Sequence, residues 1–317
     1  RHGLLAVSGL VLPDPATAYR VGVVVPPSNP VVEPELDVLL GDEILQYGAR
    51  LPRFTGLSLE ERNQRYLPAY AEALDQLYGL DVTCALVAMT GPNYQLGLDG
   101  DRALCAELTE RFGAPVSTAS LAIYRTLNSL GINRIQLLSP YPDWLTGETV
   151  RYWEGAGMTV VAVEHLLGEG QAFSAYETCT EEVVAHLQSV EPEADCAVLV
   201  TGTGLVSVAS IYQMDYGCSR PILSSNLCGA WWILQQCDCS PGSRLYREIA
   251  PGHRAACQQG GLGAEQRDGV GERGGNVYAL QHGRQHSMQL LAGPSSVNAA
   301  ESKTQTRSEE HTSELQS

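Results

Sequence analysis

The stretch ADCAVLVTGTGL, from Ala194 to Leu205, decides the fold class of this chain. It is a run of apolar, β-favouring residues that stops abruptly at Thr201-Gly202-Thr203-Gly204. A continuous apolar run that ends in a turn of small residues is typical of a buried parallel strand. When a helix follows such a turn, its backbone N–H groups form a ready site for an anion.

A second stretch has the same design. DVTCALVAMTG, from Asp81 to Gly91, is also an apolar strand, and it ends in Met89-Thr90-Gly91. Because both strand ends present a Thr among small residues, we predict two halves of the chain that face one cleft.

A weak internal repeat supports this division. YRVGVVVPPSNP, from residue 19, is similar to NRIQLLSPYPDW, from residue 133. DVTCALVAMTGPN matches ADCAVLVTGTGLV in the same way, and APVSTASLAIYRTL, from residue 114, matches RPILSSNLCGAWWIL, from residue 220. Each segment is a strand that ends in Pro, Ser, Thr or Gly before a helix. The repeat predicts two pseudo-symmetric lobes whose equivalent strand ends meet around a pseudo-twofold axis.

Strands and helices alternate along the chain, which predicts an α/β fold in which each lobe is a parallel four-stranded sheet flanked by helices. The expected strands cover 19–26, 46–54, 81–91, 114–117, 133–140, 158–164, 194–201 and 220–223. The expected helices cover 31–40, 59–80, 100–112, 121–130, 143–154, 174–190, 206–214 and 227–236. We expect lobe 1 over 19–118, completed by the helical segment 227–250, and lobe 2 over 119–226.

The two ends of the chain have a different character. Residues 1–18 are interpreted as an N-terminal extension or a partial N-terminus rather than a secretory signal, because no Met begins them and the basic region is minimal. After about Gly252 the periodicity disappears, and Gly, Gln, Ser and Arg dominate. The closing RSEEHTSELQS resembles the translation of a sequencing-adapter oligonucleotide, so 251–317 is interpreted as a non-native or disordered tail from an environmental sequencing read.

Composition excludes several classes of partner. A formal net charge of -16 over 317 residues argues against nucleic acid and anionic membranes. No apolar stretch is long enough to span a bilayer. A small anionic ligand remains compatible with this charge, because local backbone dipoles outweigh it inside a cleft. The sequence leaves open whether the protein is a monomer or a homo-oligomer.

The cysteines and histidines narrow the chemistry. Nine Cys without CxxC pairs or a secreted disulfide framework indicate a reducing cytoplasm, and Cys237-Asp238-Cys239 has no further ligands nearby, so we expect no metal. Before the tail the only His residues are His2, His165 and His186, which disfavours a Ser-His-Asp triad and a His-ligated zinc. There is no GxGxxG at the first strand and no P-loop, and we expect no cofactor.

Polar side chains gather at the carboxyl ends of the predicted strands, where open α/β sheets bind ligands. They are Ser28, Asn29, Thr90, Asn93, Tyr94, Tyr141 and Thr203. This set suits a carboxylate, or an enediolate that develops from one. The alternative for the Thr, Ser and Asn residues is helix N-capping, and the Tyr residues have packing as their alternative. Tyr141 is the strongest candidate, because the flanking Pro140 and Pro142 hold it rigidly beside a strand end.

In order and spacing these motifs resemble the aspartate/glutamate racemase superfamily, in the branch of maleate cis-trans isomerases and arylmalonate decarboxylases. The resemblance covers about 19–249 and rests on VGVVVPPSNPVVEPEL, MTGPNYQLG, LLSPYPD, VTGTGLVSVASI and RPILSSNLCGAWWIL. It implies two lobes around a central site without metal or organic cofactor. In that site, one or two strand-end cysteines move a proton or attack the substrate, and a dioxyanion hole holds a carboxylate.

Carried over to this sequence, the resemblance gives the oxyanion roles to Thr90, the N–H of Gly91, Tyr141 and the N–H of Thr203. It matches Asn29 with the substrate-contacting Asn of the isomerases. The full predicted binding set is Ser28, Asn29, Gly91, Asn93, Tyr94, Thr203 and Gly204.

The family cysteines do not carry over. Their two positions hold Met89 and Gly202. Cys84 and Cys196 lie about five residues earlier in the same strands, roughly 16 Å back along an extended chain, so they cannot replace the missing thiols.

Three functions therefore remain open. The first is a cofactor-independent decarboxylase or isomerase-like lyase that acts on a small (di)carboxylate through an enediolate, with the proton supplied by water, Tyr141 or Tyr94. The second is a catalytically degenerate, carboxylate-binding paralogue. The third is another reaction on the same fold, such as hydration or ring opening, with a Tyr or Asp143 as base.

Overall fold

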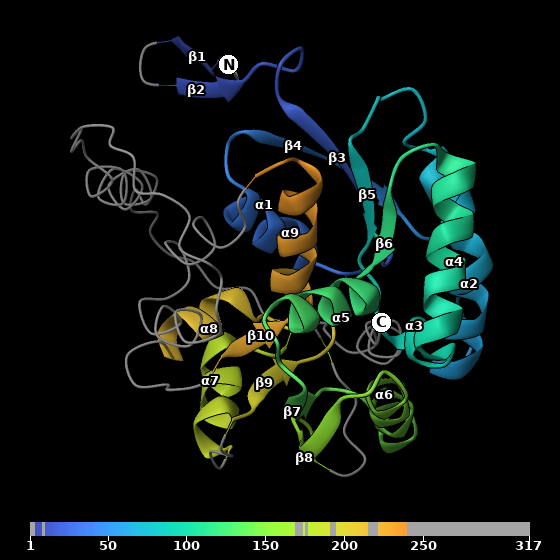
Figure 1. Ribbon diagram of the computed structural model, residues 1–317, viewed down its shortest axis with the longest axis vertical. Helices are drawn as coiled ribbons and strands as arrows, with labels where there is room; N and C mark the ends of the chain where they lie inside the picture. Colours follow the sequence, from blue (N-terminus) through green and yellow to red (C-terminus); the bar gives the residue numbers. More distant parts are fainter. Residues whose placement is uncertain are drawn as a thin grey trace, which may run out of the picture. The chain divides into compact units, whose positions relative to one another are not determined.

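The computed structural model describes residues 4–7, 10–168, 174, 177–190, 195–214 and 221–239. From β3 (Tyr19–Val25) onward, strands alternate with helices as predicted, except that α4 (Gly97–Phe112) directly follows α3 (Gly91–Tyr94) (Figure 1). The strands are β1 (Leu4–Val7), β2 (Leu10–Pro13), β3 (Tyr19–Val25), β4 (Ile44–Arg50), β5 (Cys84–Val87), β6 (Val116–Thr118), β7 (Arg134–Ser139), β8 (Thr159–His165), β9 (Ala197–Val200) and β10 (Ile222–Ser224). The helices are α1 (Val32–Leu40), α2 (Leu59–Asp75), α3 (Gly91–Tyr94), α4 (Gly97–Phe112), α5 (Ala119–Ser129), α6 (Asp143–Gly155), α7 (Thr180–Ser189), α8 (Val208–Met214) and α9 (Ser225–Gln236).

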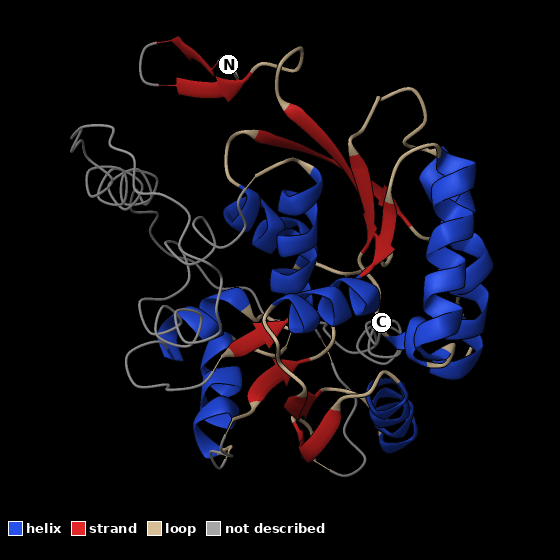
Figure 2. Ribbon diagram, in the orientation of Figure 1, coloured by secondary structure: helices blue, strands red, loops and turns tan. Residues whose placement is uncertain are grey.

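Two four-stranded parallel sheets confirm the predicted α/β fold (Figure 2). The first has the strand order β4-β3-β5-β6 and the second β8-β7-β9-β10, which is the same order repeated. The register repeats as well: Val24 pairs with Val87 in the first sheet, and Leu138 pairs with Val200 in the second. The segments that resemble each other in sequence therefore occupy equivalent places in the two sheets.

The inner strands are buried because helices cover both sheets. All four residues of β5 and all four of β9 are buried, as expected of continuous apolar runs in parallel sheets. Helix α9, which follows the second sheet in the chain, contacts β5 of the first sheet as well as α1 and α5. A methyl group at Gly229 of α9 would lie 2.7 Å from Leu86 Cδ2, so this helix needs a glycine to approach β5 so closely. The lobe boundaries that we drew, 19–118 with 227–250 and 119–226, stay a prediction.

Several elements differ from the expected ranges. The strand expected over 81–91 covers only Cys84–Val87, and α3 was not predicted. The helix expected over 59–80 ends at Asp75, because turns follow it and Gly79 has φ +85°. The helix expected over 174–190 begins at Thr180, where Cys179 N–H bonds to Glu182 Oε2 at 3.0 Å. The strand expected over 46–54 is shifted to 44–50, since Pro52 cannot continue the ladder.

The chain ends gave one surprise. Within 1–18, where no structure was predicted, β1 and β2 pair antiparallel. The predicted tail, 251–317, lies outside the described residues. In the part of the chain that is described, no helix combines the length and apolar character needed to cross a bilayer.

Candidate functional site

The two lobes meet through the strand-end residue Thr90. Thr90 lies three residues beyond the end of β5, and its Oγ1 is 2.5 Å from the hydroxyl oxygen of Tyr141, two residues beyond the end of β7. Both residues are buried, with exposed fractions of 2% and 7%. The Thr90 hydroxyl makes no capping bond to α3. The capping alternative is therefore wrong for Thr90, and its hydroxyl faces the other lobe.

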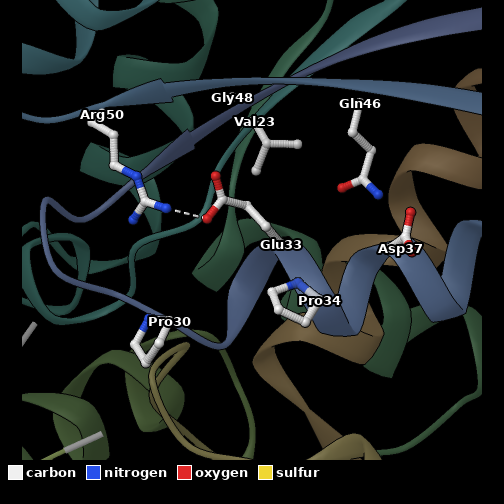
Figure 3. Close-up of a pocket in the computed structure, with 8 residues that line it drawn as sticks. All are labelled: Val23, Pro30, Glu33, Pro34, Asp37, Gln46, Gly48 and Arg50. Atoms are coloured by element: carbon white, nitrogen blue, oxygen red, sulfur yellow. Dashed lines mark hydrogen bonds and ion pairs between the residues drawn. The ribbon is translucent and has the colours of Figure 1, made fainter. Parts of the chain in front are cut away.

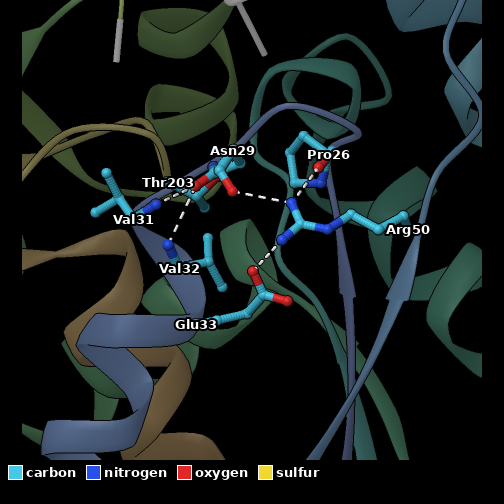
Figure 4. A network of polar contacts seen from close by, with 7 residues as sticks. All are labelled: Pro26, Asn29, Val31, Val32, Glu33, Arg50 and Thr203. Atoms are coloured by element: carbon cyan, nitrogen blue, oxygen red, sulfur yellow. Dashed lines mark hydrogen bonds and ion pairs between the residues drawn. The ribbon is translucent and has the colours of Figure 1, made fainter. Parts of the chain in front are cut away.

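The pseudo-equivalent strand end makes the reciprocal contact. Thr203 lies three residues beyond the end of β9, and its Oγ1 accepts a hydrogen bond from Asn29 Nδ2 at 3.3 Å, as Figure 4 shows. Thr203 Oγ1 in turn donates to the carbonyl oxygen of Ala88 at 2.9 Å. The two contacts are equivalent. The Thr that follows β5 contacts the residue that follows β7 in the other lobe, and the Thr that follows β9 contacts a residue that follows β3. The predicted meeting of equivalent strand ends is present.

Asn29 has two roles at once. Its Oδ1 accepts hydrogen bonds from the N–H groups of Val31 and Val32 at 2.9 and 3.1 Å, at the start of α1. Its Nδ2 is the donor to Thr203, so the capping role and a contact with the other lobe are combined. The guanidinium of Arg50 donates to the carbonyl oxygens of Pro26 and Asn29, which holds this turn in place.

A third contact between the lobes comes from Tyr94. Its hydroxyl lies 2.6 Å from Thr201 Oγ1, and its ring packs edge-on against those of Tyr141, Tyr152 and Trp153. Burial raises the pKa of Tyr94 well above its usual range. Burial also raises the pKa of Tyr141 to about 12, although hydrogen bonds with Thr90 and Thr201 lower it. Both phenols are therefore protonated at neutral pH and able to donate hydrogen bonds.

The two family cysteine positions differ in what they offer. Met89 is 1% exposed and packs in a core cluster with Tyr66 and Tyr70. Gly202 has φ +92°, and a methyl group there would lie 2.9 Å from Pro140 Cγ and 3.5 Å from the Tyr141 hydroxyl oxygen. The backbone at 202 therefore has a conformation that favours glycine and lies directly beside Tyr141.

The cysteines that β5 and β9 do have nearby lie at the amino ends of these strands, away from the carboxyl ends where the family cysteines are expected. Cys84 is the first residue of β5, and Cys196 comes just before β9; both are buried. Hydrogen bonding to Cys237, followed by burial, raises the pKa of Cys84. Neither thiol therefore takes the place of a strand-end cysteine. Among the described residues, no group of three or more His, Cys, Asp or Glu side chains is arranged to hold a metal ion.

Asn93 lies behind the contact region. Its Oδ1 accepts a hydrogen bond from the Tyr70 hydroxyl at 3.0 Å, and its Nδ2 donates to Asp101 Oδ1 at 3.1 Å. Both ends of the predicted binding side chain are thus already occupied within lobe 1. The other predicted binding residues surround the contacts between the lobes: Gly91 and Gly204 are buried directly after Thr90 and Thr203, and Ser28 is half-buried in the turn before Asn29.

Sequence analysis missed two buried carboxylates. Asp101, fully buried, accepts hydrogen bonds from Ser120 at 2.7 Å, Thr118 at 2.8 Å and Tyr152 at 2.8 Å. Burial raises its pKa, and these hydrogen bonds lower it. The network ties α4, α5 and α6 together behind Asn93. Its only sequence signal is an acidic residue near the start of a helix, with Leu98, Leu104 and Cys105 three or four residues away.

Glu35 is the second of them. It belongs to the first turn of α1, but it is 8% exposed and reaches the start of α8 in the other lobe. Its carboxylate accepts hydrogen bonds from the N–H groups of Ser207 and Val208 at 2.6 and 2.8 Å, and from Asn226 Nδ2 at 2.7 Å. Burial raises the pKa of Glu35, and the hydrogen bonds lower it. Asn226 Nδ2 also donates to the Thr203 carbonyl oxygen at 3.0 Å, which connects Glu35 to the contact region.

A groove of about 660 Å³ lies elsewhere, between α1 and the strands β3 and β4 (Figure 3). Glu33, Asp37 and Arg50 line it, and the Arg50 guanidinium already pairs with Glu33. None of the predicted site residues lines this groove. The strand-end contacts therefore remain the candidate site.

Comparison with known proteins agrees with the fold. The chain is 27% identical over 246 residues to the maleate isomerase of Nocardia farcinica, covering 72% of this chain and 96% of that protein. It is 24% identical over 151 residues to the arylmalonate decarboxylase of Bordetella bronchiseptica, covering 46% of this chain and 62% of that protein. The structure of a mutant of the Nocardia farcinica maleate cis-trans isomerase with a covalently bound succinylcysteine intermediate matches with a TM-score of 0.60 and 23% identity, over 70% of this chain and 94% of that one. The family model for arylmalonate decarboxylase matches residues 21–246, and the chain therefore belongs to the arylmalonate decarboxylase family.

Proposed function

We propose that this chain is a cofactor-independent carbon-acid enzyme that acts on a small dicarboxylate through an enediolate held in a dioxyanion hole. The observation that carries the proposal is the meeting of Thr90, Tyr141 and Thr203 between the lobes, beside the glycine backbone at 202. The names of its relatives, maleate isomerase and arylmalonate decarboxylase, support the substrate class.

The bound carboxylate takes the place of the direct bond between Thr90 and Tyr141. Both hydroxyls then donate to carboxylate oxygens, whereas only one of them donates in their direct bond, and the N–H groups of Gly91 and Thr203 supply further donors. Donors fixed in this way stabilise negative charge that develops on the oxygens. When a malonate loses CO2, the electron pair of the broken C–C bond passes into the remaining carboxylate as an enediolate, which this cradle stabilises.

Protonation of the enediolate carbon completes the reaction. With Met89 and Gly202 in the family cysteine positions, the proton comes from water or from the hydroxyl of Tyr141 or Tyr94. A tyrosine that gives its proton to carbon recovers one from solvent. This route involves no covalent adduct on a cysteine. It therefore differs from the chemistry of the Nocardia farcinica isomerase structure, which contains a succinylcysteine intermediate.

A catalytically degenerate, carboxylate-binding paralogue is the second candidate. The observation that favours it is that no described cysteine lies at the carboxyl ends of β5 and β9, while the nearby phenols of Tyr94 and Tyr141 have raised pKa values and are weak acids. Hydration or ring opening with Asp143 as base has less support, since the Asp143 side chain is 99% exposed and lies 3.8 Å from His165. The described cysteines are free, which supports the proposed location in a reducing cytoplasm.

Incubation of the purified chain with malonates and with maleate tests the proposal. Release of CO2 from a malonate, or loss of the cis alkene of maleate, supports an enzyme. Measurable binding of these dicarboxylates without turnover supports the paralogue. Absence of both binding and turnover would overturn both candidates.

A further inference from the structure

The amide of Asn63 is buried without a partner beside the candidate site. Asn63 lies in α2, its side chain is 1% exposed, and neither Oδ1 nor Nδ2 makes a hydrogen bond. A methyl group at Gly91 would lie 3.4 Å from Asn63 Nδ2 and 3.8 Å from Oδ1. The amide is therefore packed against the residue that directly follows Thr90. Buried amides in folded proteins are nearly always hydrogen-bonded, so this one calls for an explanation.

The preceding residue, Arg62, is a second buried group with an unpaired atom. It is 3% exposed, and its Nε has no hydrogen-bond partner. None of the ion pairs within the described residues involves Arg62. Buried arginines are rare unless a counter-charge accompanies them. One turn of α2 thus holds a buried amide without a hydrogen-bond partner and a buried guanidinium whose Nε has none.

We propose that Asn63 and Arg62 form a subsite for the second carboxylate of an aliphatic dicarboxylate substrate. The proposal rests on the proposed function, in which the first carboxylate lies between Thr90 and Tyr141. Asn63 Nδ2 donates to the second carboxylate, and the guanidinium supplies the compensating positive charge. Asn63 Oδ1 is left for a hydroxyl group or a water molecule that enters with the substrate.

The absence of a side chain at Gly91 is part of this arrangement. Gly91 lies between Asn63 and Leu145 of α6, and the side chains of both would be 3.4 Å from a methyl group there. Because residue 91 is glycine, no side chain at this position fills the space beside the Asn63 amide. An aryl ring at this place would leave both polar atoms of Asn63 unpaired, which binding sites penalise strongly. The subsite therefore favours an aliphatic dicarboxylate that places its second carboxylate here over an arylmalonate that places its ring here.

Binding measurements on the full chain test this subsite. Isothermal titration with maleate and with phenylmalonate is expected to show tighter binding of maleate. Asn63→Leu should weaken maleate binding about tenfold or more, as loss of one hydrogen bond to a charged group predicts, and leave phenylmalonate binding unchanged or tighter. Arg62→Gln should weaken maleate binding and reduce its dependence on salt. Gln64→Leu, an exposed amide on the same helix, is the matched control and should change neither.

The outcomes separate the subsite from the proposed function. If Thr90→Val abolishes maleate binding while Asn63→Leu binds it like the wild type, the subsite is wrong and the carboxylate cradle stands. If the wild type binds neither ligand, both proposals fail. Should Asn63→Leu not fold, Asn63→Asp keeps the shape and adds a negative charge, and unchanged maleate binding by that variant would overturn the subsite equally.

Discussion

The hydroxyl groups of Thr90 and Tyr141 lie 2.5 Å apart, although one follows a strand of the first sheet and the other a strand of the second. The pseudo-equivalent Thr203 makes its own bond across the lobes, to Asn29. A ligand that binds between Thr90 and Tyr141 replaces hydrogen bonds between the two lobes with hydrogen bonds to itself. Its affinity is therefore the difference between two sets of hydrogen bonds, and substitutions here change both.

Removal of either hydroxyl should impair the site. Thr90→Val and Tyr141→Phe are each expected to lower turnover of an accepted dicarboxylate by about 10²–10³-fold, because each removes one oxyanion donor. Tyr78→Phe, at a side chain that is 82% exposed, is the control and should leave turnover unchanged. In a double-mutant cycle on unfolding free energy, the pair should show a coupling of about 0.5–3 kcal/mol. Strictly additive losses would contradict the contact between these two groups.

Gly202→Ala should destabilise the fold by about 1–3 kcal/mol. The residue has φ +92°, which side chains other than glycine rarely adopt, and the added methyl group would lie 2.9 Å from a ring carbon of Pro140. Gly202→Cys carries the same strain and places its thiol beside the Tyr141 hydroxyl. The matched control is Gly147→Ala in the interior of α6, where a methyl group meets nothing within 4 Å; it should stabilise by about 0.5–1 kcal/mol. Urea denaturation measures both, and equal stabilities would refute the assigned backbone conformation.

Two substitutions at Asn29 separate its two roles. Asn29→Ala removes the acceptor at the start of α1 and should cost about 1 kcal/mol. Asn29→Asp keeps an acceptor oxygen for α1 but replaces the donor to Thr203, and it adds a negative charge at the site. The Asp variant should therefore be more stable than the Ala variant and bind maleate more weakly than the wild type. Calorimetric binding and urea melts give both readings; an Asp variant as unstable as the Ala variant would show that capping is not what Asn29 contributes.

Glu35 should make stability fall as pH rises above the ordinary glutamate range. Its pKa in the folded state is raised, chiefly by burial, so between the unfolded value near 4.5 and the folded value the unfolded chain binds fewer protons. The free energy of unfolding then decreases with pH in that window and levels off above the folded pKa. In Glu35→Gln this part of the slope disappears, while the slope from Asp101, whose pKa is also raised, remains. Urea melts at several pH values measure the slope, with exposed Glu60→Gln as the control that should match the wild type.

Much of the fold follows from the sequence, because burial in a parallel sheet requires continuous apolar runs such as CALV in β5 and AVLV in β9. The internal repeat predicts two similar lobes, and the two sheets have the same strand order. The pairing of β1 with β2 was not foreseen, because the sequence pattern within 1–18 was interpreted only as an extension. Helix ends such as that of α2 depend on local turns, and periodicity alone places them poorly.

For the site, sequence order placed Thr90, Tyr141 and Thr203 at strand ends, and the parallel arrangement brought them together. The partner of each side chain was not predictable. Asn93 was expected in the binding set, yet it bonds to Tyr70 and Asp101. Glu35 looked like an ordinary acidic residue in the first turn of α1, yet it caps a helix of the other lobe. Both outcomes depend on contacts between residues far apart in the chain, which spacing does not encode.

The hydrogen bonds that hold the strand ends together all join a residue before β6 to one after β7. A polypeptide cut between these strands would divide every donor from its acceptor, so neither fragment alone would possess a usable site. Mixing the two fragments would restore ligand binding only if they reassociate in their native pairing. The duplicated architecture thus makes the proposed site a shared property of two half-proteins.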